Sequence, residues 1–86
     1  MLTVYSKANC PQCDQAKSLL ELKQVLFQEV RVDLDPVARQ YLVNQGHRSV
    51  PQIYSHGELF VKGGYQGLKN LTEQQFQLLK ETQHVN

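Results

Sequence analysis

The chain has 86 residues and carries nine Lys or Arg against eight Asp or Glu, which gives a formal net charge of +1 at pH 7. This length suits one domain with a modest core, and the balanced charges disfavour a nucleic-acid-binding or membrane-surface protein. No apolar run approaches the roughly 20 residues that cross a membrane, and Met1–Thr3 begins a strand rather than a signal peptide. We therefore expect a single domain over residues 1–86.

The first predicted elements are a buried strand at residues 2–6 and a helix that runs from Pro11 to about Lys23. Proline suits the first helical position, where the backbone N–H has no intrahelical partner. Cys10 is then the cap residue, and Cys13 lies one turn further on the same side of the helix. The apolar residues at helical spacing are Ala16, Leu19 and Leu20. A strand that turns directly into a helix is therefore the expected setting of both cysteines.

The next predicted elements are a strand at residues 27–34 and a second helix that begins at Pro36. In the strand, apolar and charged residues alternate, which predicts one covered face made of Val30, Val32 and Leu34. Asp35 is a typical N-cap before a proline, and Gly46 is a plausible left-handed stop. The apolar stripe of this helix is Val37, Ala38, Tyr41 and Leu42. Strand, helix, strand, helix in this order predicts a parallel strand pair joined by a right-handed crossover.

A hairpin follows, with short strands at residues 51–54 and 58–61 and a tight turn at residues 55–57. Gly63 and Gly64 end its second strand. Paired glycines at this place indicate positive φ or the close approach of another backbone.

The last segment has two helical parts. Residues 66–71 form a first helical turn, and Thr72 to Gln75 matches a capping box with Leu71 and Phe76 as a hydrophobic staple. The residues expected to dock the final helix are Phe76, Leu78 and Leu79. The resulting order is β-α-β-α-β-β-α, which predicts an α/β domain.

The spacing Cys10-Pro11-Gln12-Cys13 predicts a dithiol redox site. A helix N-terminus offers free N–H groups and partial positive charge, which favour the thiolate that attacks disulfides. Lys7 adds positive charge three residues before Cys10, whereas Asp14 opposes it, so we expect a lowered pKa for Cys10. Two cysteines in a small chain without a secretory signal fit a reducing compartment, and we expect a cytoplasmic protein.

Four other roles of the cysteines stay open at this point. A closed zinc site needs four Cys or His ligands, but the chain has two cysteines and its three histidines lack paired spacing. The thiols could be buried and inert. They could also form a clamp for Cu(I) or share an iron–sulfur cluster between two subunits. Copper carriers of this size have the order β-α-β-β-α-β, which the helix predicted after Pro36 contradicts. We expect no metal ligands.

With C-P-Q-C, Ser49-Val50-Pro51 and Gly63-Gly64 in register, nearly the whole sequence resembles a glutaredoxin. The resemblance implies a thioredoxin fold, with a four-stranded mixed sheet flanked by three helices, and a cis peptide bond before Pro51. It implies a dithiol–disulfide oxidoreductase that reduces protein disulfides or glutathione mixed disulfides. It also implies chemistry without a tightly bound cofactor, with glutathione as co-substrate and a disulfide-containing partner such as ribonucleotide reductase. We expect a monomer, because one amphipathic set of elements suffices to bury the core.

The resemblance also assigns roles by position. Cys10 matches the exposed nucleophile and Cys13 the resolving thiol of the family. Lys7 matches the residue that meets the glycyl carboxylate of glutathione. The backbone of Val50 matches the edge that pairs with the cysteinyl part, and Pro51 holds that edge open.

The γ-glutamyl end of glutathione would meet Gly64, Tyr65 and Gln66, and we expect Tyr65 to be exposed near the site. Members that use glutathione often have one or two Asp shortly after Gly-Gly, to meet the γ-glutamyl ammonium group. Here Gln66 stands in that region, and a neutral amide is a weaker partner for a cation. Gln12 stands where tyrosine is common, which removes an aromatic contact.

Both departures weaken the case for tight binding of glutathione, and they leave open an alternative, a glutaredoxin-like redoxin that thioredoxin reductase recycles. His47 and Arg48, which precede the Val50 edge, either attract an anionic substrate or form a plain exposed turn.

Overall fold

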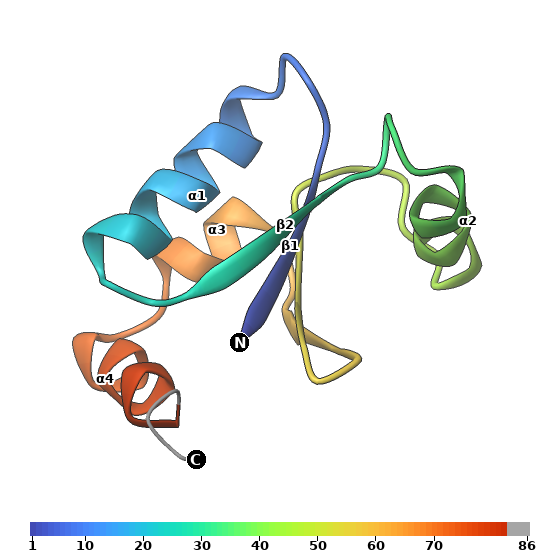
Figure 1. Cartoon of the computed structure of the whole chain (residues 1–86). Coiled ribbons are helices and arrows are strands. Elements are labelled where there is room, and N and C mark those ends of the chain that lie inside the picture. Colours follow the sequence, from blue (N-terminus) through green and yellow to red (C-terminus); the bar gives the residue numbers. More distant parts are fainter. Residues whose placement is uncertain (83–86) are drawn as a thin grey trace.

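The computed structural model describes residues 1–82 and orders their strands and helices as β-α-β-α-β-β-α-α (Figure 1). The elements are β1 (Leu2–Ser6), α1 (Pro11–Leu22), β2 (Phe27–Arg31), α2 (Pro36–Asn44), β3 (Gln52–Ser55), β4 (Glu58–Val61), α3 (Tyr65–Lys69) and α4 (Glu73–Thr82). Within this part of the chain no helix is long and apolar enough to cross a bilayer.

The four strands form one mixed sheet in the order β2-β1-β3-β4. β1 pairs in parallel with β2 and antiparallel with β3, and β3 and β4 form an antiparallel hairpin. Helices α1 and α3 cover one face of the sheet and α2 covers the other (Figure 1). This arrangement confirms the predicted parallel pair, its helical crossover and the hairpin.

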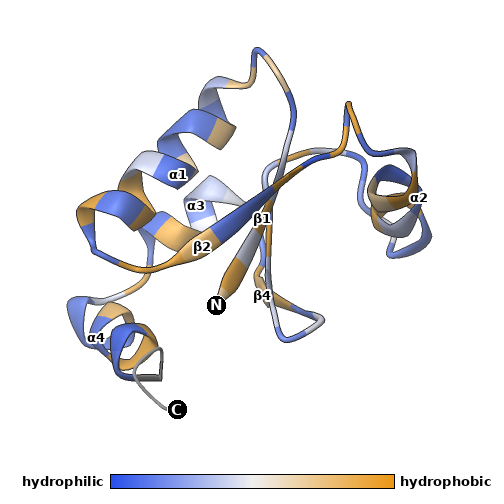
Figure 2. Ribbon diagram, viewed as in Figure 1, coloured by the Kyte–Doolittle hydropathy of each residue, from blue (hydrophilic) through white to orange (hydrophobic). Residues whose placement is uncertain are grey.

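The core lies between the sheet and the helices α1 and α3. Alternate residues of β1 point to this side, and Leu2 and Val4 are buried there against α1. The other fully or nearly fully buried members are Ala16, Leu20, Val25, Ile53, Leu68 and Phe76. The mixed blue and orange segments of α1 in Figure 2 reflect its two faces, one toward water and one toward this core.

Local side chains start the helices as the sequence predicts. The Asp35 carboxylate accepts a hydrogen bond from Ala38 N–H at 3.0 Å. At α4, Thr72 N–H donates to Gln75 Oε1 at 2.8 Å, and Gln75 N–H donates to Thr72 Oγ1 at 3.1 Å. These contacts satisfy backbone donors that a helix N-terminus leaves free. The predicted cap at Asp35 and the capping box are therefore confirmed.

Strand β2 is shorter than predicted. It ends at Arg31, and the chain then turns, with Leu34 N–H donating to Arg31 O at 3.1 Å. Two hydrogen bonds from the Arg31 guanidinium to the Asp33 carboxylate, of 2.8 and 2.6 Å, hold this turn. Leu34 is consequently 73% exposed, and the prediction that it shares a covered face was wrong.

Two other apolar residues lie outside the core against expectation. Val37 is 80% exposed because α2 packs through Leu42 instead, and Leu78 is 54% exposed on α4. The expected final helix is divided into α3 and α4, in line with the two helical parts predicted on either side of Thr72.

The Glu29 carboxylate on β2 accepts hydrogen bonds from side chains of β1 and α1 and so links the three elements. Ser6 is fully buried, and its Oγ donates to Glu29 Oε2 at 2.5 Å. Lys17 Nζ donates to the same oxygen at 2.8 Å. The hydrogen bond from Lys17, and then that from Ser6, hold the pKa of Glu29 below its ordinary value of 4.5. The carboxylate therefore stabilises the fold in its ionised form.

Replacing Glu29 with glutamine is expected to lower the free energy of unfolding at neutral pH by up to about 1 kcal/mol. The amide can still accept from Ser6, so the loss isolates the carboxylate charge. Because the folded-state pKa is lowered, this contribution is present above the ordinary carboxyl pKa and is lost as the pH falls through the folded value. Urea unfolding at pH 7 and at about pH 3 measures the difference in free energy of unfolding between wild type and Glu29→Gln. Glu58 is exposed, so Glu58→Gln is the control that makes the same change in charge. A difference between wild type and Glu29→Gln that does not shrink in acid would contradict the prediction.

Candidate active site

Cys10 caps α1, as the sequence predicts. Its backbone is extended (φ −120°, ψ 96°), and its Sγ accepts the N–H of Cys13 at 3.2 Å. A disulfide joins the two residues, whose Cα atoms lie 5.2 Å apart. The helix therefore places one cysteine at its N-terminus and the other one turn inside, with sulfurs in reach of each other.

The two sulfurs differ in exposure. Cys13 is 0% exposed, whereas Cys10 is 7% exposed. Cys10 is thus less open than the expected exposed nucleophile, because Val50 O lies 3.8 Å from its Sγ. It is still the one cysteine of the pair that solvent reaches.

Residues 47–50 lead to the Val50 carbonyl oxygen, which lies beside Cys10 Sγ. Two hydrogen bonds to side chains of β3 hold this segment in place. Gln52 Nε2 donates to Ser49 O at 2.8 Å. His47 Nε2 and Tyr54 Oη lie at hydrogen-bond distance, 2.7 Å. The next peptide bond, Val50–Pro51, is cis, as the resemblance implied.

Three tyrosine rings support this segment on the α2 side of the sheet. Tyr5, Tyr41 and Tyr54 have ring centroids 5.4 to 6.1 Å apart, and the His47 ring meets Tyr54 edge-on at 5.7 Å. Burial, and then the neighbouring Tyr41, raise the pKa of both Tyr5 and Tyr54. These hydroxyls therefore stay neutral around pH 7, and the cluster acts as a packed support.

Gly64 brings a second segment against the Val50–Pro51 edge. It is buried with φ +56°, and a Cβ at this position would lie 2.5 Å from Pro51 O and 3.3 Å from Pro51 Cγ. Only glycine fits so close to another backbone. The prediction of positive φ or close approach is confirmed in both respects.

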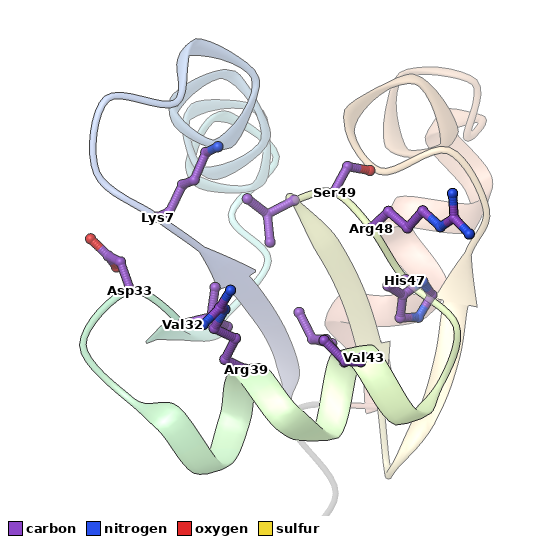
Figure 3. A pocket seen from close by; sticks show the side chains of 10 residues that line it. Lys7, Val32, Asp33, Arg39, Val43, His47, Arg48 and Ser49 are labelled. Carbon is purple, nitrogen blue, oxygen red and sulfur yellow. The ribbon is translucent and has the colours of Figure 1, made fainter.

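Two cavities border the Val50 edge. One, of about 380 Å³, has Lys7, Arg39 and Arg48 around it, each from a different segment of the chain (Figure 3). The other, of about 370 Å³, extends over the side where Gly64 lies. His47, Ser49 and Val50 line both cavities, so these three residues form a wall common to the two.

Most of the predicted binding residues meet here. Lys7 lines the first cavity, and the second is lined by Gln12, Val50, Pro51 and Gly64. His47 and Arg48 also border the first cavity, and their role with an anionic substrate stays a prediction.

Tyr65 and Gln66 line neither of these two cavities. Tyr65 is half-buried and packs on the core at the start of α3, with Lys69 Nζ 5.7 Å from its ring centroid. Our expectation that Tyr65 is exposed was wrong, because α3 turns this residue inward. Gln66 is exposed on the same short helix.

The sequence analysis missed three charged residues at the site, Asp33, Arg39 and Lys62. The hydrogen bonds from the Arg31 guanidinium, and then that from Ala8 N–H at 3.1 Å, hold the pKa of Asp33 well below its ordinary value. Lys62 directly precedes Gly63-Gly64, so the predicted hairpin could have placed it. Arg39 could be placed only once the packing of α2 was known.

No group of three or more His, Cys, Asp or Glu side chains within residues 1–82 could hold a metal ion.

A sequence profile of the glutaredoxin family matches residues 2–60. The chain belongs to the glutaredoxin family. The solved structure of wheat glutaredoxin superposes with a TM-score of 0.74 at 26% identity, over 93% of this chain and 78% of the wheat chain. The thioredoxin fold with its four-stranded mixed sheet is thereby confirmed for this family member.

Two curated relatives illustrate the range of the family around this chain. Glutaredoxin 3 of Escherichia coli (strain K12) is 40% identical over 52 residues, which cover 59% of this chain and 63% of that protein. The glutaredoxin-like protein NrdH of Lactococcus lactis (subsp. cremoris, strain MG1363) is 38% identical over 53 residues, covering 62% and 74%. The match therefore spans less than two thirds of the length of Glutaredoxin 3. This glutaredoxin resembles both kinds of relative to a similar degree.

Proposed function

We propose that this glutaredoxin is a dithiol–disulfide oxidoreductase in which Cys10 is the nucleophile and Cys13 the resolving thiol. The observation that carries the proposal is the place of Cys10 at the N-cap of α1, where its Sγ accepts Cys13 N–H at 3.2 Å. In the reduced protein this N–H and the positive end of the helix dipole stabilise the Cys10 thiolate. Burial of Cys13 disfavours its own thiolate, so attack begins at Cys10.

The reaction has two exchange steps. The Cys10 thiolate attacks one sulfur of the substrate disulfide, a Cys10–substrate bond forms, and the other substrate sulfur leaves as a thiolate that takes up a proton. Cys13 then loses its proton and attacks Cys10 Sγ, which restores the Cys10–Cys13 bond and releases the second substrate thiol. Two electrons and two protons pass to the substrate, and the chain ends as the disulfide seen here.

The Val50 edge is the proposed docking site for the substrate cysteine. The Val50 carbonyl oxygen lies 3.8 Å from Cys10 Sγ, so an extended substrate segment could pair with this backbone like a short added strand. Lys7, Gln12, Pro51 and Gly64 complete the two cavities beside it. Contacts of Tyr65 and Gln66 with glutathione stay a prediction.

To complete the cycle, a reductant must reduce the Cys10–Cys13 disulfide, and two reductants are candidates. Glutathione is the co-substrate that the resemblance implies, and thioredoxin reductase is the alternative, supported by similarity to proteins named NrdH. The proposed protein substrate is a disulfide-containing enzyme such as ribonucleotide reductase. The protein would act as a cytoplasmic monomer without a tightly bound cofactor.

Two recycling assays test the function and its reductant together. Oxidised protein is mixed either with glutathione or with NADPH and thioredoxin reductase, and reduction of Cys10–Cys13 is followed. Because Gln66 replaces an acidic residue, we expect slow reduction by glutathione and fast reduction by the reductase. Fast reduction by glutathione together with slow reduction by the reductase would contradict the reductase alternative. Reduction by neither would contradict the oxidoreductase itself.

A further inference from the structure

Residues 47–50, which lead to the Val50 edge, belong to no helix or strand. Their position is therefore set by individual hydrogen bonds and not by a backbone ladder. At the start of the segment, His47 N–H donates to Leu42 O at 3.0 Å, in the last turn of α2. Nearer the edge, Ser49 O accepts the Gln52 amide. Figure 3 shows His47 and Ser49 along this segment, which is held by the fold at both places.

The side chain of His47 joins the same segment to β3. Its Nε2 lies 2.7 Å from the hydroxyl oxygen of Tyr54, at hydrogen-bond distance. Tyr54 is 4% exposed and lies on an inner strand of the sheet, between β1 and β4. A buried phenol hydroxyl needs a hydrogen-bond partner, and here that partner is a side chain of an irregular segment. The pair therefore connects a rigid strand to the start of the segment that ends at the Val50 edge.

Neighbouring aromatic rings restrict the Tyr54 ring. Its centroid lies 5.4 Å from that of Tyr5 and 5.8 Å from that of Tyr41, both in edge-on contact. A ring packed in this way cannot change its rotamer without displacing its neighbours. Tyr41 uses its own hydroxyl elsewhere, as a donor to Gly57 O at 3.5 Å in the turn between β3 and β4. The Tyr54 hydroxyl is thus a fixed support for the His47 ring.

We propose that Tyr54 is a positioning residue, which acts through His47 on the Val50 edge. The inference rests on the proposed oxidoreductase function and goes beyond it, because it separates the groups that set substrate affinity from those that set the reactivity of Cys10. A backbone edge that is already in place pairs with an extended peptide without first losing conformational freedom. The His47–Tyr54 pair should therefore favour disulfides carried by peptides over small disulfides that have no backbone.

Two mixed disulfides made with the same chromophoric thiol test this inference. In one, the other half is the cysteine of a short extended peptide, and in the other it is mercaptoethanol, which has no backbone. Tyr54→Phe removes the hydroxyl and keeps the ring. We expect KM for the peptide disulfide to rise by roughly two- to tenfold, the usual worth of one hydrogen bond, at unchanged kcat. The value of kcat/KM for the small disulfide should stay the same.

Tyr41→Phe is the matched control, because it removes a hydroxyl from the same ring cluster and leaves the His47–Tyr54 pair intact. It should leave KM for the peptide disulfide unchanged. The rate of Cys10 alkylation by iodoacetamide, and its pH dependence, should be the same in wild type and Tyr54→Phe. Equal losses of kcat/KM for both disulfides, or an altered alkylation profile, would show that Tyr54→Phe acts on the whole fold and would overturn the inference.

Variants of His47 test whether the two residues act together. His47→Leu offers no hydrogen bond to Tyr54, whereas the amide of His47→Gln does. We expect His47→Leu to raise KM for the peptide disulfide as Tyr54→Phe does, and His47→Gln to raise it less. The double variant with Leu and Phe should lose no more than either single variant, because both remove the same contact. Additive losses would contradict the inference alone, whereas a wild type that reduces neither disulfide would contradict the proposed function itself.

Discussion

Replacement of Cys10 with serine is expected to lower the rate of reduction of every disulfide substrate by on the order of a thousandfold or more, because the remaining thiol, Cys13, is buried and out of reach of an incoming disulfide. Cys13→Ser should keep only the single-thiol reaction, in which a second thiol molecule releases the product. With a protein disulfide, Cys13→Ser should accumulate a stable Cys10–substrate adduct. Turnover assays measure the loss of activity, and intact-mass analysis of acid-quenched samples detects the Cys10–substrate adduct.

The control for this pair is the reduced wild type, because both variants lack the Cys10–Cys13 disulfide. Thermal unfolding of the variants and of reduced wild type should coincide within a few degrees. If Cys13→Ser reduces protein disulfides as fast as wild type, the assignment of Cys13 as resolving thiol is wrong.

Replacement of Gly64 with alanine is expected to have the second largest effect. The added Cβ would lie 2.5 Å from Pro51 O, and φ +56° with ψ −120° is a conformation that L residues rarely adopt. Together the contact and the backbone conformation should cost about 3 kcal/mol of the free energy of unfolding. Displacement of Pro51 moves the adjoining Val50 edge, so kcat/KM should fall by at least about tenfold.

Gly46→Ala is the matched control. Gly46 also has positive φ (+87°), but a Cβ there would meet nothing within 4 Å. It should lose about 1 kcal/mol from the backbone conformation alone and keep its activity. Urea unfolding and turnover of both variants separate the close contact from the backbone effect. Equal losses in the two variants would show that contact with Pro51 is unimportant.

The parts of the fold that the sequence predicts well are those set by neighbouring residues. Pro11, Asp35 and Thr72 mark helix starts because cap and first-turn preferences are local, and each start is where it was expected. The end of β2 could not be predicted in the same way. It depends on Arg31 pairing with Asp33 across a turn, which a regular alternation of apolar residues does not reveal.

The same distinction applies to the site. Cys10 and Cys13 are three residues apart on one helix, so their geometry follows from the local sequence. Gly64 could be predicted to approach some backbone closely, but the sequence does not say which one. Lys62 could have been placed at the site from the predicted hairpin, whereas Arg39 joins the site only through the packing of α2, which the sequence does not reveal.

The most direct test of the account is the pH dependence of alkylation of the reduced protein by iodoacetamide, with the modified cysteine identified by mass spectrometry. We expect reaction at Cys10 before Cys13, with an apparent pKa well below the value of about 8.5 for a free cysteine, because the helix N-terminus favours the Cys10 thiolate. Equal alkylation of both cysteines, or an apparent Cys10 pKa at the free value, would contradict the claim that the cap of α1 makes Cys10 the nucleophile.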